Sequence, residues 1–266
     1  MYRLIALDCD GTLLNSKKEI TDRTVTAIRR ASSAGISIVL ASARPFYRLK
    51  PFINKLGIAS NDQYTIAFNG GLIVNNTESK VLFSGGFTIE EVKEIIALGM
   101  QYKTAMFLYS KDGILSNVND EKYKKKNPDV SFNVVDLETI DITHIQIYKI
   151  AYVNSPEETI LLRTKLPGTL FNKFEISSSV PQFIEFVSKG VTKSGALEYV
   201  GQELNILPKE MVAFGDQDND IPMLQHVGLS IAMGNATPEV KKHAKITTMS
   251  NDEDGVAAAI ESKILP

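Results

Sequence analysis

The chain has 266 residues, of which 44% are hydrophobic and 23% are charged, and these values exclude the disordered, collagen-like and coiled-coil classes. Its formal net charge of -2 gives no global electrostatic reason to bind nucleic acid or an anionic membrane. The single cysteine, Cys9, cannot close an intramolecular disulfide, and every apolar run is shorter than the roughly 20 residues that cross a bilayer. We therefore expect a soluble, cytoplasmic protein with no nucleic-acid or membrane partner, while its oligomeric state is not predicted.

The first 85 residues alternate between apolar runs and amphipathic stretches. Leu4–Leu7 is short and continuously apolar, which is typical of a strand buried on both faces of a parallel sheet. Apolar side chains then recur at helical spacing between Thr21, a good helix-capping residue, and Gly35, a good helix terminator. A strand over Ile36–Leu40 follows directly, so the order strand, helix, strand predicts a right-handed βαβ unit. Further expected elements are a helix over Phe46–Leu56 and strands over Tyr64–Phe68, Leu72–Val74 and Val81–Phe83.

From Gly86 the pattern changes to strands and helices that favour an antiparallel sheet. The expected elements are helices over Ile89–Gln101 and Glu157–Lys165 and strands over Thr104–Tyr109, Gly113–Val118, Ile145–Val153, Leu170–Ile176 and Gln182–Val187. The lysine-rich stretch Tyr123–Asn127 is interpreted as a solvated surface rather than a nucleic-acid patch.

After Lys189 the α/β pattern returns and continues to the end of the chain. It predicts helices over Lys193–Leu204, Asn219–His226, Pro238–His243 and from Gly255 onward, and strands over Met211–Phe214, Leu229–Met233 and Ile246–Met249. The predicted fold class is therefore α/β, with a Rossmann-like parallel-sheet core formed by residues 1–85 and 189–266. This core is interrupted by an inserted α+β cap domain at residues 86–188.

Two acidic clusters each follow a predicted buried strand. The first contains Asp8 and Asp10 in the sequence Asp-Cys-Asp-Gly-Thr, and the second contains Asp216 and Asp220. Because ligands bind at the carboxyl ends of the strands of an open parallel sheet, we expect both clusters to meet in one crevice. Carboxylates brought together there would repel one another without a cation, and a set of oxygen ligands suits Mg²⁺. The sequence thus predicts Mg²⁺ as the cofactor.

The acidic clusters also allow two other interpretations. A single group of Asp and Asn residues is most often a helix cap or a turn. The spacing of Asp216, Asp218 and Asp220 matches the start of an EF-hand calcium loop, but Ile221 stands where that loop needs glycine and Val227 where it needs glutamate. A calcium loop is therefore disfavoured.

Two further elements between the clusters are suited to phosphate. Ser42 and Arg44 follow the strand Ile36–Leu40, where a hydroxyl and backbone N–H groups stand at the start of a helix. Lys193 begins another predicted helix and carries a fixed positive charge. Singly these residues would be a cap and a surface lysine, but four such elements at strand ends or helix starts indicate one shared site.

In this order the residues resemble the four motifs of the haloacid dehalogenase (HAD) superfamily: a nucleophile loop, a hydroxyl residue after the second strand, a lysine and a terminal acidic motif. The matching residues are Asp8, Asp10, Ser42, Lys193, Asp216, Asn219 and Asp220. The long insertion between Ser42 and Lys193, preceded by Asn69-Gly70, is similar to the Cof-type phosphatase branch, which carries a mobile cap there. The resemblance covers nearly the whole chain.

The resemblance implies hydrolysis of a phosphate ester. Asp8 would attack phosphorus to form an aspartyl phosphate, and Asp10 would protonate the leaving oxygen and then activate water. Mg²⁺ would be held by Asp8, Asp216 and Asp10, the last through its backbone carbonyl. Lys193 would complete the catalytic set and, with Ser42 and Asn219, bind the phosphoryl oxygens. The supporting residues are Asp220, Arg44, Asn69 and Gly11.

Cys9 stands between the two catalytic candidates, yet it is a poor nucleophile. Two negative neighbours raise the pKa of a thiol and disfavour the thiolate, and strand alternation points Cys9 away from Asp8.

The favoured function is Mg²⁺-dependent hydrolysis of a small phosphorylated metabolite, and sugar phosphates are the class that the resemblance implies. A hexose phosphomutase could use the same Asp8 and Asp10 with a similar cap. A third hypothesis is a non-catalytic regulator that binds phosphate or metal, although such a protein has no need of a proton donor beside the nucleophile.

Overall fold

The computed structural model describes residues 2–118, 132–178 and 181–265, so the lysine-rich stretch Tyr123–Asn127 lies outside the described residues. The chain divides into two compact units, one formed by Met1–Ser84 with Thr192–Pro266 and the other by Gly85–Val191. The second unit begins one residue before and ends three residues after the range 86–188 expected from the sequence. The second unit ends later than residue 188 because it includes the turn at Gly190, where φ is 77°.

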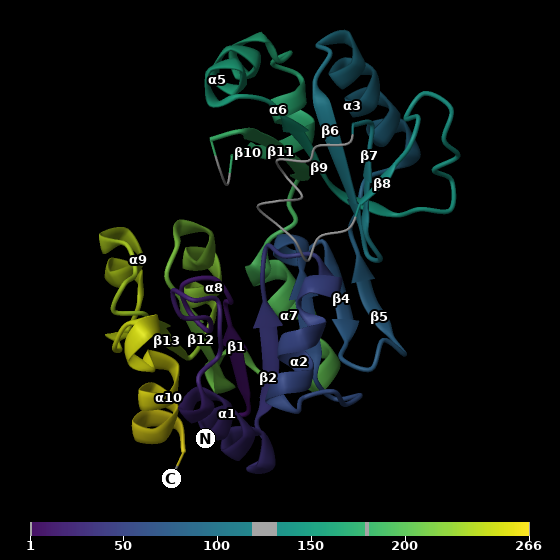
Figure 1. Cartoon of the computed structure of the whole chain (residues 1–266). Helices are drawn as coiled ribbons and strands as arrows, with labels where there is room; N and C mark the ends of the chain where they lie inside the picture. The colour runs from purple at the N-terminus through teal and green to yellow at the C-terminus, as the bar shows by residue number, and fades with distance from the viewer. Residues whose placement is uncertain (1, 119–131, 179–180, 266) are drawn as a thin grey trace. The chain divides into compact units, whose positions relative to one another are not determined.

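The first unit is built on an eight-stranded sheet in the order β14-β13-β12-β1-β2-β3-β4-β5. The strands from β14 to β3 are parallel, and β4 and β5 are antiparallel additions at one edge (Figure 1). The bounds are β1 Leu4–Leu7, β2 Ser37–Ala41, β3 Tyr64–Ala67, β4 Leu72–Asn75, β5 Val81–Ser84, β12 Met211–Gly215, β13 Leu229–Ala232 and β14 Ile246–Thr247.

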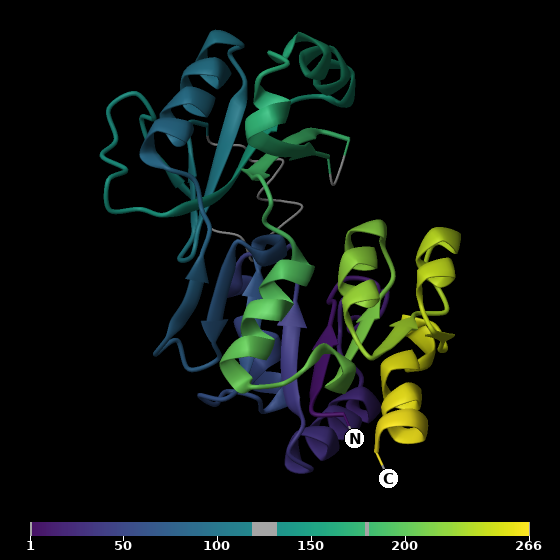
Figure 2. The same cartoon turned by 180° about the vertical axis from the view of Figure 1, so that it is seen from behind.

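Helices cover both faces of this sheet. Their bounds are α1 Asp22–Ser33, α2 Lys50–Leu56, α7 Lys193–Leu204, α8 Ile221–His226, α9 Pro238–His243 and α10 Gly255–Ala259. Helix α1 packs against α2 and α10, whereas α7 packs against α8 and α8 against α9. Figure 1 shows α1 and α2 in front of the sheet, and Figure 2, seen from behind, shows α7 in front of it. All four residues of β1 are buried between these layers, as their apolar run predicts.

The helix predicted over Phe46–Leu56 is divided in two. Phe46–Arg48 forms a short 3-10 helix, and α2 begins at Lys50. Pro51 stands in the first turn of α2, where its missing N–H is tolerated. Since proline cannot donate to the preceding turn, one continuous helix through this position is disfavoured.

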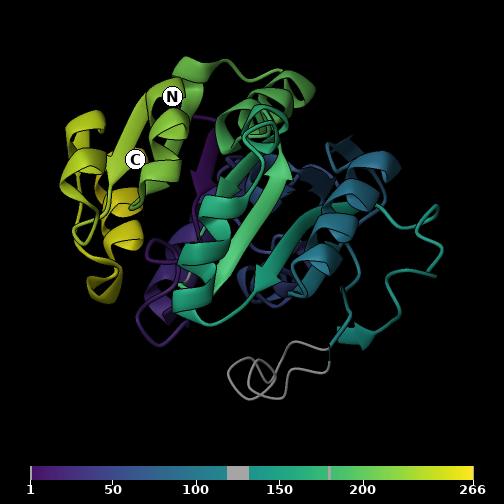
Figure 3. The same cartoon turned by 90° about the horizontal axis from the view of Figure 1, so that it is seen from above.

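The second unit contains a six-stranded sheet in the order β10-β11-β9-β6-β7-β8. Its neighbouring strands are antiparallel, apart from the parallel pair β7 and β8. The bounds are β6 Ala105–Ser110, β7 Ile114–Ser116, β8 Phe132–Val134, β9 Ile147–Val153, β10 Phe174–Ser177 and β11 Phe183–Ser188, with helices α3 Ile89–Gln101, α5 Pro156–Lys165 and α6 Leu170–Lys173. Figure 3 shows α3 and α5 over the same face of this sheet, where Met106 and Leu108 of β6 join the apolar core.

Two predictions for the second unit are corrected. The first half of the strand expected over Leu170–Ile176 is helix α6, because N–H groups of Leu170 and Phe171 bond to the carbonyls of Pro167 and Gly168 at 3.0 and 3.2 Å and start a turn. Strand β8 was not predicted. It has only three residues, and its pairing with β7 is long-range.

The longest of the helices in the described ranges is α3, with 13 residues. A bilayer-spanning helix needs roughly 20 predominantly apolar residues. Within these ranges, then, no helix has the length and apolarity for a transmembrane span.

Candidate active site

The candidate residues come from three neighbouring strands of the first sheet. β1 lies between β12 and β2, and Leu7 is in register with Phe214 and Leu40. Asp8, Asp216 and Ser42 each follow one of these strands. Parallel alignment therefore brings them to the same edge of the sheet, although the chain separates Asp8 from Asp216 by the whole insert.

Lys193 links the two acidic clusters. Its Nζ lies 2.5 Å from Asp8 Oδ1 and 2.7 Å from Asp220 Oδ1, and its side chain is only 2% exposed. Lys193 is the first residue of α7, where the Thr192 hydroxyl caps the helix by accepting from the N–H of Gly195. The cap fixes the direction in which the lysine enters the core.

Asp220 is almost saturated by partners within the protein. Its Oδ1 accepts from Lys193, and its Oδ2 accepts from the backbone N–H groups of Asp216 and Gln217 at 3.0 and 3.2 Å. These bonds hold the loop after β12 in shape. Asp220 thus joins Lys193 to the backbone of Asp216 and Gln217.

The three buried carboxylates of Asp8, Asp216 and Asp220 each present an oxygen within 4.8 Å of the others. Burial raises the pKa of Asp8 to about 7, with the charge of Lys193 opposing and those of Asp220 and Asp216 adding to the rise. Burial also raises the pKa of Asp216, against the hydrogen bonds that it accepts from Thr12 and Gln217. A divalent cation bound by oxygen ligands would stabilise these charges, so the donor set fits Mg²⁺.

Gly11 and Thr12 support Asp216 from the nucleophile loop. The Thr12 hydroxyl donates to Asp216 Oδ1 at 2.8 Å. Gly11 has a φ of +85°, and a Cβ there would overlap the Asp216 carboxylate. Its carbonyl accepts from the Asn235 side chain at 2.8 Å. Gly11 was predicted as a supporting residue, but no role was predicted for Thr12 or Asn235. The only sequence feature that pointed to Thr12 was its place in the Asp-Cys-Asp-Gly-Thr motif.

Asp10 stands apart from the three clustered carboxylates. Arg44 donates to it twice, from Nε to Oδ2 at 2.6 Å and from Nη2 to Oδ1 at 2.7 Å, and Lys18 Nζ donates to Oδ1 at 2.9 Å. Partial burial would raise the pKa of Asp10, but the hydrogen bonds from Arg44 and Lys18 outweigh it and hold the pKa at about 2. Lys18 was missed because it stands eight residues from Asp10, outside any recognisable motif.

Ser42, Asn69 and Asn219 are connected by hydrogen bonds. The buried Ser42 Oγ accepts from the N–H of Arg44 at 3.2 Å, and its carbonyl accepts from the N–H of Asn69 at 2.9 Å. The Asn219 amide donates to Asn69 Oδ1 at 3.3 Å. Asn69 has a φ of 57°, a conformation that asparagine tolerates better than most residues. Of the residues predicted to bind phosphate, Ser42 and Asn219 are thus linked through the supporting residue Asn69, whereas Lys193 bonds to Asp8 and Asp220.

Cys9 is fully buried beside these groups. Burial, followed by the negative charge of Asp8, raises the pKa of its thiol to about 12. The nucleophilic thiolate is therefore not populated near neutral pH, and the side chain acts as a small apolar residue.

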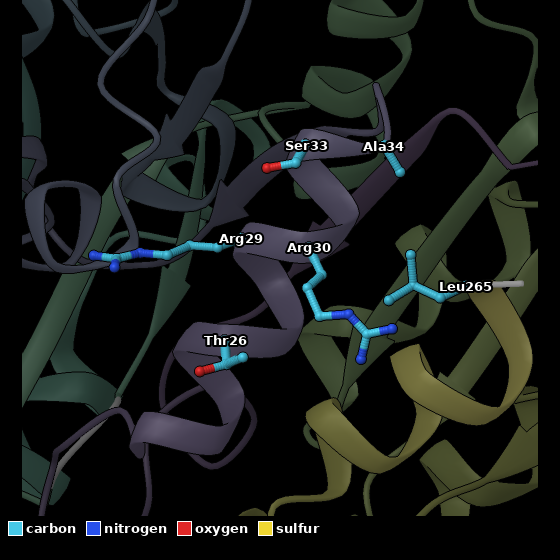
Figure 4. Close-up of a pocket in the computed structure, with 6 residues that line it drawn as sticks. All are labelled: Thr26, Arg29, Arg30, Ser33, Ala34 and Leu265. Carbon is cyan, nitrogen blue, oxygen red and sulfur yellow. The ribbon is translucent and has the colours of Figure 1, made fainter.

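A separate pocket lies on the first unit (Figure 4), lined by Thr26, Arg29, Arg30, Ser33, Ala34 and Leu265. In Figure 4 Arg30 extends toward Leu265 while Arg29 points away. The Arg29 guanidinium donates to the carbonyls of Leu56 and Lys55 at 3.2 and 2.8 Å and so joins α1 to the end of α2. None of the lining residues belongs to the acidic site.

This arrangement of a buried aspartate, a lysine and a second acidic loop at the carboxyl edge of a parallel sheet agrees with the family match. The model of the haloacid dehalogenase-like hydrolases matches residues 5–260. The chain belongs to this family. A Bacillus subtilis (strain 168) protein with a provisional phosphatase name is 31% identical over 272 residues, covering 100% of this chain and 99% of the relative. An HMP-PP phosphatase of Yersinia pseudotuberculosis is 27% identical, covering 91% of this chain and 87% of the relative.

Solved structures agree over nearly the full length. A haloacid dehalogenase-like hydrolase from Bacteroides thetaiotaomicron has a TM-score of 0.90 and 32% identity, covering 98% of this chain and 99% of that chain. A structure described as a HAD subclass IIB sugar phosphatase has a TM-score of 0.77 and 25% identity, covering 97% of this chain and 98% of that chain. The predicted α/β fold class and the prediction of a HAD-type phosphatase are thereby confirmed at the level of the family.

Proposed function

We propose that the protein hydrolyses small phosphate monoesters in two steps through a phosphorylated Asp8. The observation that carries the proposal is the position of the Asp8 carboxylate, which is buried beside Asp216 and bonded to Lys193 at 2.5 Å. A nucleophile, a fixed cation and a second carboxylate able to share a metal are what the reaction requires.

The Asp8 carboxylate has one engaged and one available oxygen. Oδ1 accepts from Lys193, whereas among the described residues Oδ2 has no hydrogen-bond donor. A carboxylate held at one oxygen keeps its orientation while the rest of the group remains accessible to a ligand. This supports Asp8 as the attacking group.

In the first step an Asp8 oxygen forms a bond to phosphorus as the bond from phosphorus to the ester oxygen breaks. The hydrogen bonds from Arg44 and Lys18 keep the Asp10 carboxylate ionised in this structure, so the acid role requires that Asp10 takes up a proton when substrate binds and donates it to that departing oxygen. In the second step Asp10 accepts a proton from water, whose oxygen attacks phosphorus, and the Asp8 carboxylate and inorganic phosphate are released. Lys193, the Ser42 hydroxyl and the Asn219 amide neutralise and orient the phosphoryl oxygens.

The buried acidic cluster supports a bound Mg²⁺. Asp8, Asp216 and the backbone carbonyl of Asp10 would hold it, and Asp220 would support it through Lys193 and the loop after β12. When bound, the ion supplies positive charge that lets a carboxylate approach a phosphate dianion.

The substrate class is proposed as sugar phosphates. The likeness to a HAD subclass IIB sugar phosphatase supports this choice, and the HMP-PP phosphatase relative makes diphosphate esters the second class to test. A hexose phosphomutase would interconvert isomers without releasing phosphate. A non-catalytic regulator would bind a phosphorylated ligand and leave it intact.

Turnover is expected to require a divalent cation. EDTA-treated protein should release phosphate from no member of a panel of sugar phosphates, other monoesters and diphosphates, and added Mg²⁺ should restore activity, because the buried carboxylates repel one another without a cation. The control is protein kept in EDTA that has been saturated with Mg²⁺ beforehand. Full activity of the metal-free protein would remove the metal from the mechanism. Isomer interconversion, or binding without release, would replace the phosphatase proposal.

The unit Gly85–Val191 is proposed to be a cap that selects the substrate. Its own apolar core, built from α3, α5 and the strands they cover, indicates that it packs separately. Replacing residues 85–191 with the corresponding insert of a relative should therefore change the rank of substrates by kcat/KM, while the Mg²⁺ requirement stays. The test is the same phosphate-release panel. An unchanged rank would place specificity in the unit that holds Asp8.

A further inference from the structure

A short segment between β13 and α9, residues 234–237, bonds to both loops that carry the proposed metal ligands. The Asn235 side-chain amide donates to the Gly11 carbonyl of the nucleophile loop at 2.8 Å. Two residues further on, the backbone N–H of Thr237 donates to the Asp216 carbonyl at 3.1 Å. The segment therefore contacts the two sides of the acidic site at once.

These hydrogen bonds close into a ring. The Gly11 carbonyl and the Thr12 N–H belong to one peptide group, and the Thr12 hydroxyl donates to Asp216 Oδ1 at 2.8 Å. Asp216 is thus held at two points, its side chain by Thr12 and its main-chain carbonyl by Thr237. Because Thr237 is two residues from Asn235, the bonds return to the segment in which they began. The ring ties the nucleophile loop to the Asp216 carboxylate.

Both ends of the Asn235 amide are engaged in this ring and its neighbourhood. While Nδ2 donates to Gly11, Oδ1 accepts from the backbone N–H of Asn251 at 3.0 Å, so the partners define the orientation of the amide. The Asn251 side chain in turn donates to the Leu14 carbonyl at 2.8 Å, further along the nucleophile loop. Asn235 therefore lies where the segments after β13 and β14 meet the nucleophile loop.

The contact of Asn235 is better placed to restrain the nucleophile loop than to stabilise the core. Asn235 is exposed, and exposed hydrogen bonds compete with water, so their net contribution to folding is small. Gly11 has a φ of +85°. Because glycine adopts positive and negative φ about equally well, a hydrogen bond to its carbonyl helps to select one conformation.

We propose that Asn235 is a positioning residue for the divalent-cation site: by holding the Gly11–Thr12 peptide, it keeps the nucleophile loop in place against Asp216 before a cation binds. This inference rests on the proposed metal site, and it concerns the affinity for the ion rather than the chemistry at phosphorus. A site that is assembled in advance loses less conformational freedom on binding. Asn235 should therefore raise the affinity for Mg²⁺.

The test compares Asn235→Ala with Asn54→Ala, a matched change at an exposed position of α2. Mg²⁺ is titrated into each protein by isothermal titration calorimetry without substrate, and urea unfolding in EDTA reports on the metal-free fold. Residues that orient metal ligands typically contribute roughly 10- to 100-fold to metal affinity. Since Asn235 acts through an intervening peptide, we expect its Ala variant to bind Mg²⁺ about 10-fold more weakly, near the lower limit. Its metal-free urea midpoint should stay close to that of the wild type, and Asn54→Ala should bind Mg²⁺ like the wild type.

Two further measurements distinguish positioning from a general loss of structure. Excess Mg²⁺ should restore phosphate release by Asn235→Ala, because the ion is bound more weakly but is used in the same way. A double-mutant cycle of Asn235→Ala with Thr12→Val on the Kd for Mg²⁺ tests the route through the ring. Once the Thr12 hydroxyl is absent, removal of the Asn235 amide should weaken binding less than it does in the wild type.

An unchanged Kd in Asn235→Ala, an equal loss in Asn54→Ala, or additive effects with Thr12→Val would overturn the positioning role. Loss of the metal-free fold in Asn235→Ala would overturn it as well, because the role would then be structural. A wild type that binds Mg²⁺ but releases no phosphate would contradict the proposed hydrolysis, while the titrations would still decide the role of Asn235. A wild type that binds no Mg²⁺ would overturn this inference together with the metal site.

Discussion

Replacing Asp8 with asparagine is expected to abolish hydrolysis of every substrate. The amide cannot form the bond to phosphorus, so no covalent phosphate should appear on the protein, and kcat should fall by roughly 10⁴-fold or more, as for loss of other catalytic nucleophiles. Phosphate release and intact-protein mass spectrometry with rapid quenching check this. Asp8→Asn protein that still turned over, or that carried a phosphoryl group, would move the nucleophile to another residue.

The same substitution should stabilise the metal-free protein. The pKa of Asp8 is raised to about 7 in the folded state, above its ordinary value, so its contribution to stability is lost as the pH rises through about 7. Asparagine carries no charge to bury. In EDTA at pH 8 the free energy of unfolding should rise by about 1 kcal/mol or more, since one pKa unit corresponds to about 1.4 kcal/mol. Urea unfolding of Asp8→Asn and of the wild type at pH 5 and pH 8 measures this difference in the free energy of unfolding. An Asp8→Asn protein that is inactive and less stable than the wild type at pH 8 would instead have lost activity through misfolding.

Replacing Lys193 with methionine is expected to lower both stability and activity strongly. Lys193 is buried between Asp8 and Asp220, and burial would lower its pKa, but the charges of these two aspartates outweigh burial and raise it. Removing one member of a buried charged group leaves the others uncompensated, which typically costs about 3–5 kcal/mol. We expect the free energy of unfolding, measured with urea in EDTA, to fall by this amount in Lys193→Met. Phosphate release should be lost as well.

The loss in the Lys193→Met variant should depend on pH. Without the lysine the pKa of Asp8 rises above 7, so the stability of the variant keeps falling as the pH rises past 7, where the wild type has already lost this contribution. The deficit relative to the wild type should therefore be larger at pH 8 than at pH 5. Lys242→Met is the control, because Lys242 pairs with Glu239 at the surface, where their side chains are 70% and 52% exposed. It should change stability by less than about 1 kcal/mol. A similar effect of the two substitutions would contradict the buried network.

Much of the fold could be predicted because its signals are local. The apolar run Leu4–Leu7 became β1, and the cap at Thr21 set the start of α1. The sequence pattern predicted an insert at residues 86–188; the structure divides into compact units at Gly85–Val191, and the role of this unit as a cap is a proposal. Predictions failed where local signals conflict with the turn chemistry, as at Leu170–Lys173, or where a strand is short and paired at long range, as at Phe132–Val134.

By itself the sequence supplied the candidate residues for the chemistry and the prediction that Asp8 and Asp216 follow buried strands, because hydrophobic runs and motif spacing are properties of the chain. The tertiary structure decided which side chains meet. Lys193 and Asp8 are 185 positions apart and bond only because α7 and β1 pack in one unit. Asp10 is held by Arg44 and Lys18, and Asp220 joins Lys193 and the loop after β12. Side-chain partners depend on distances of a few tenths of a nanometre between segments remote in sequence, and these distances are fixed only by packing.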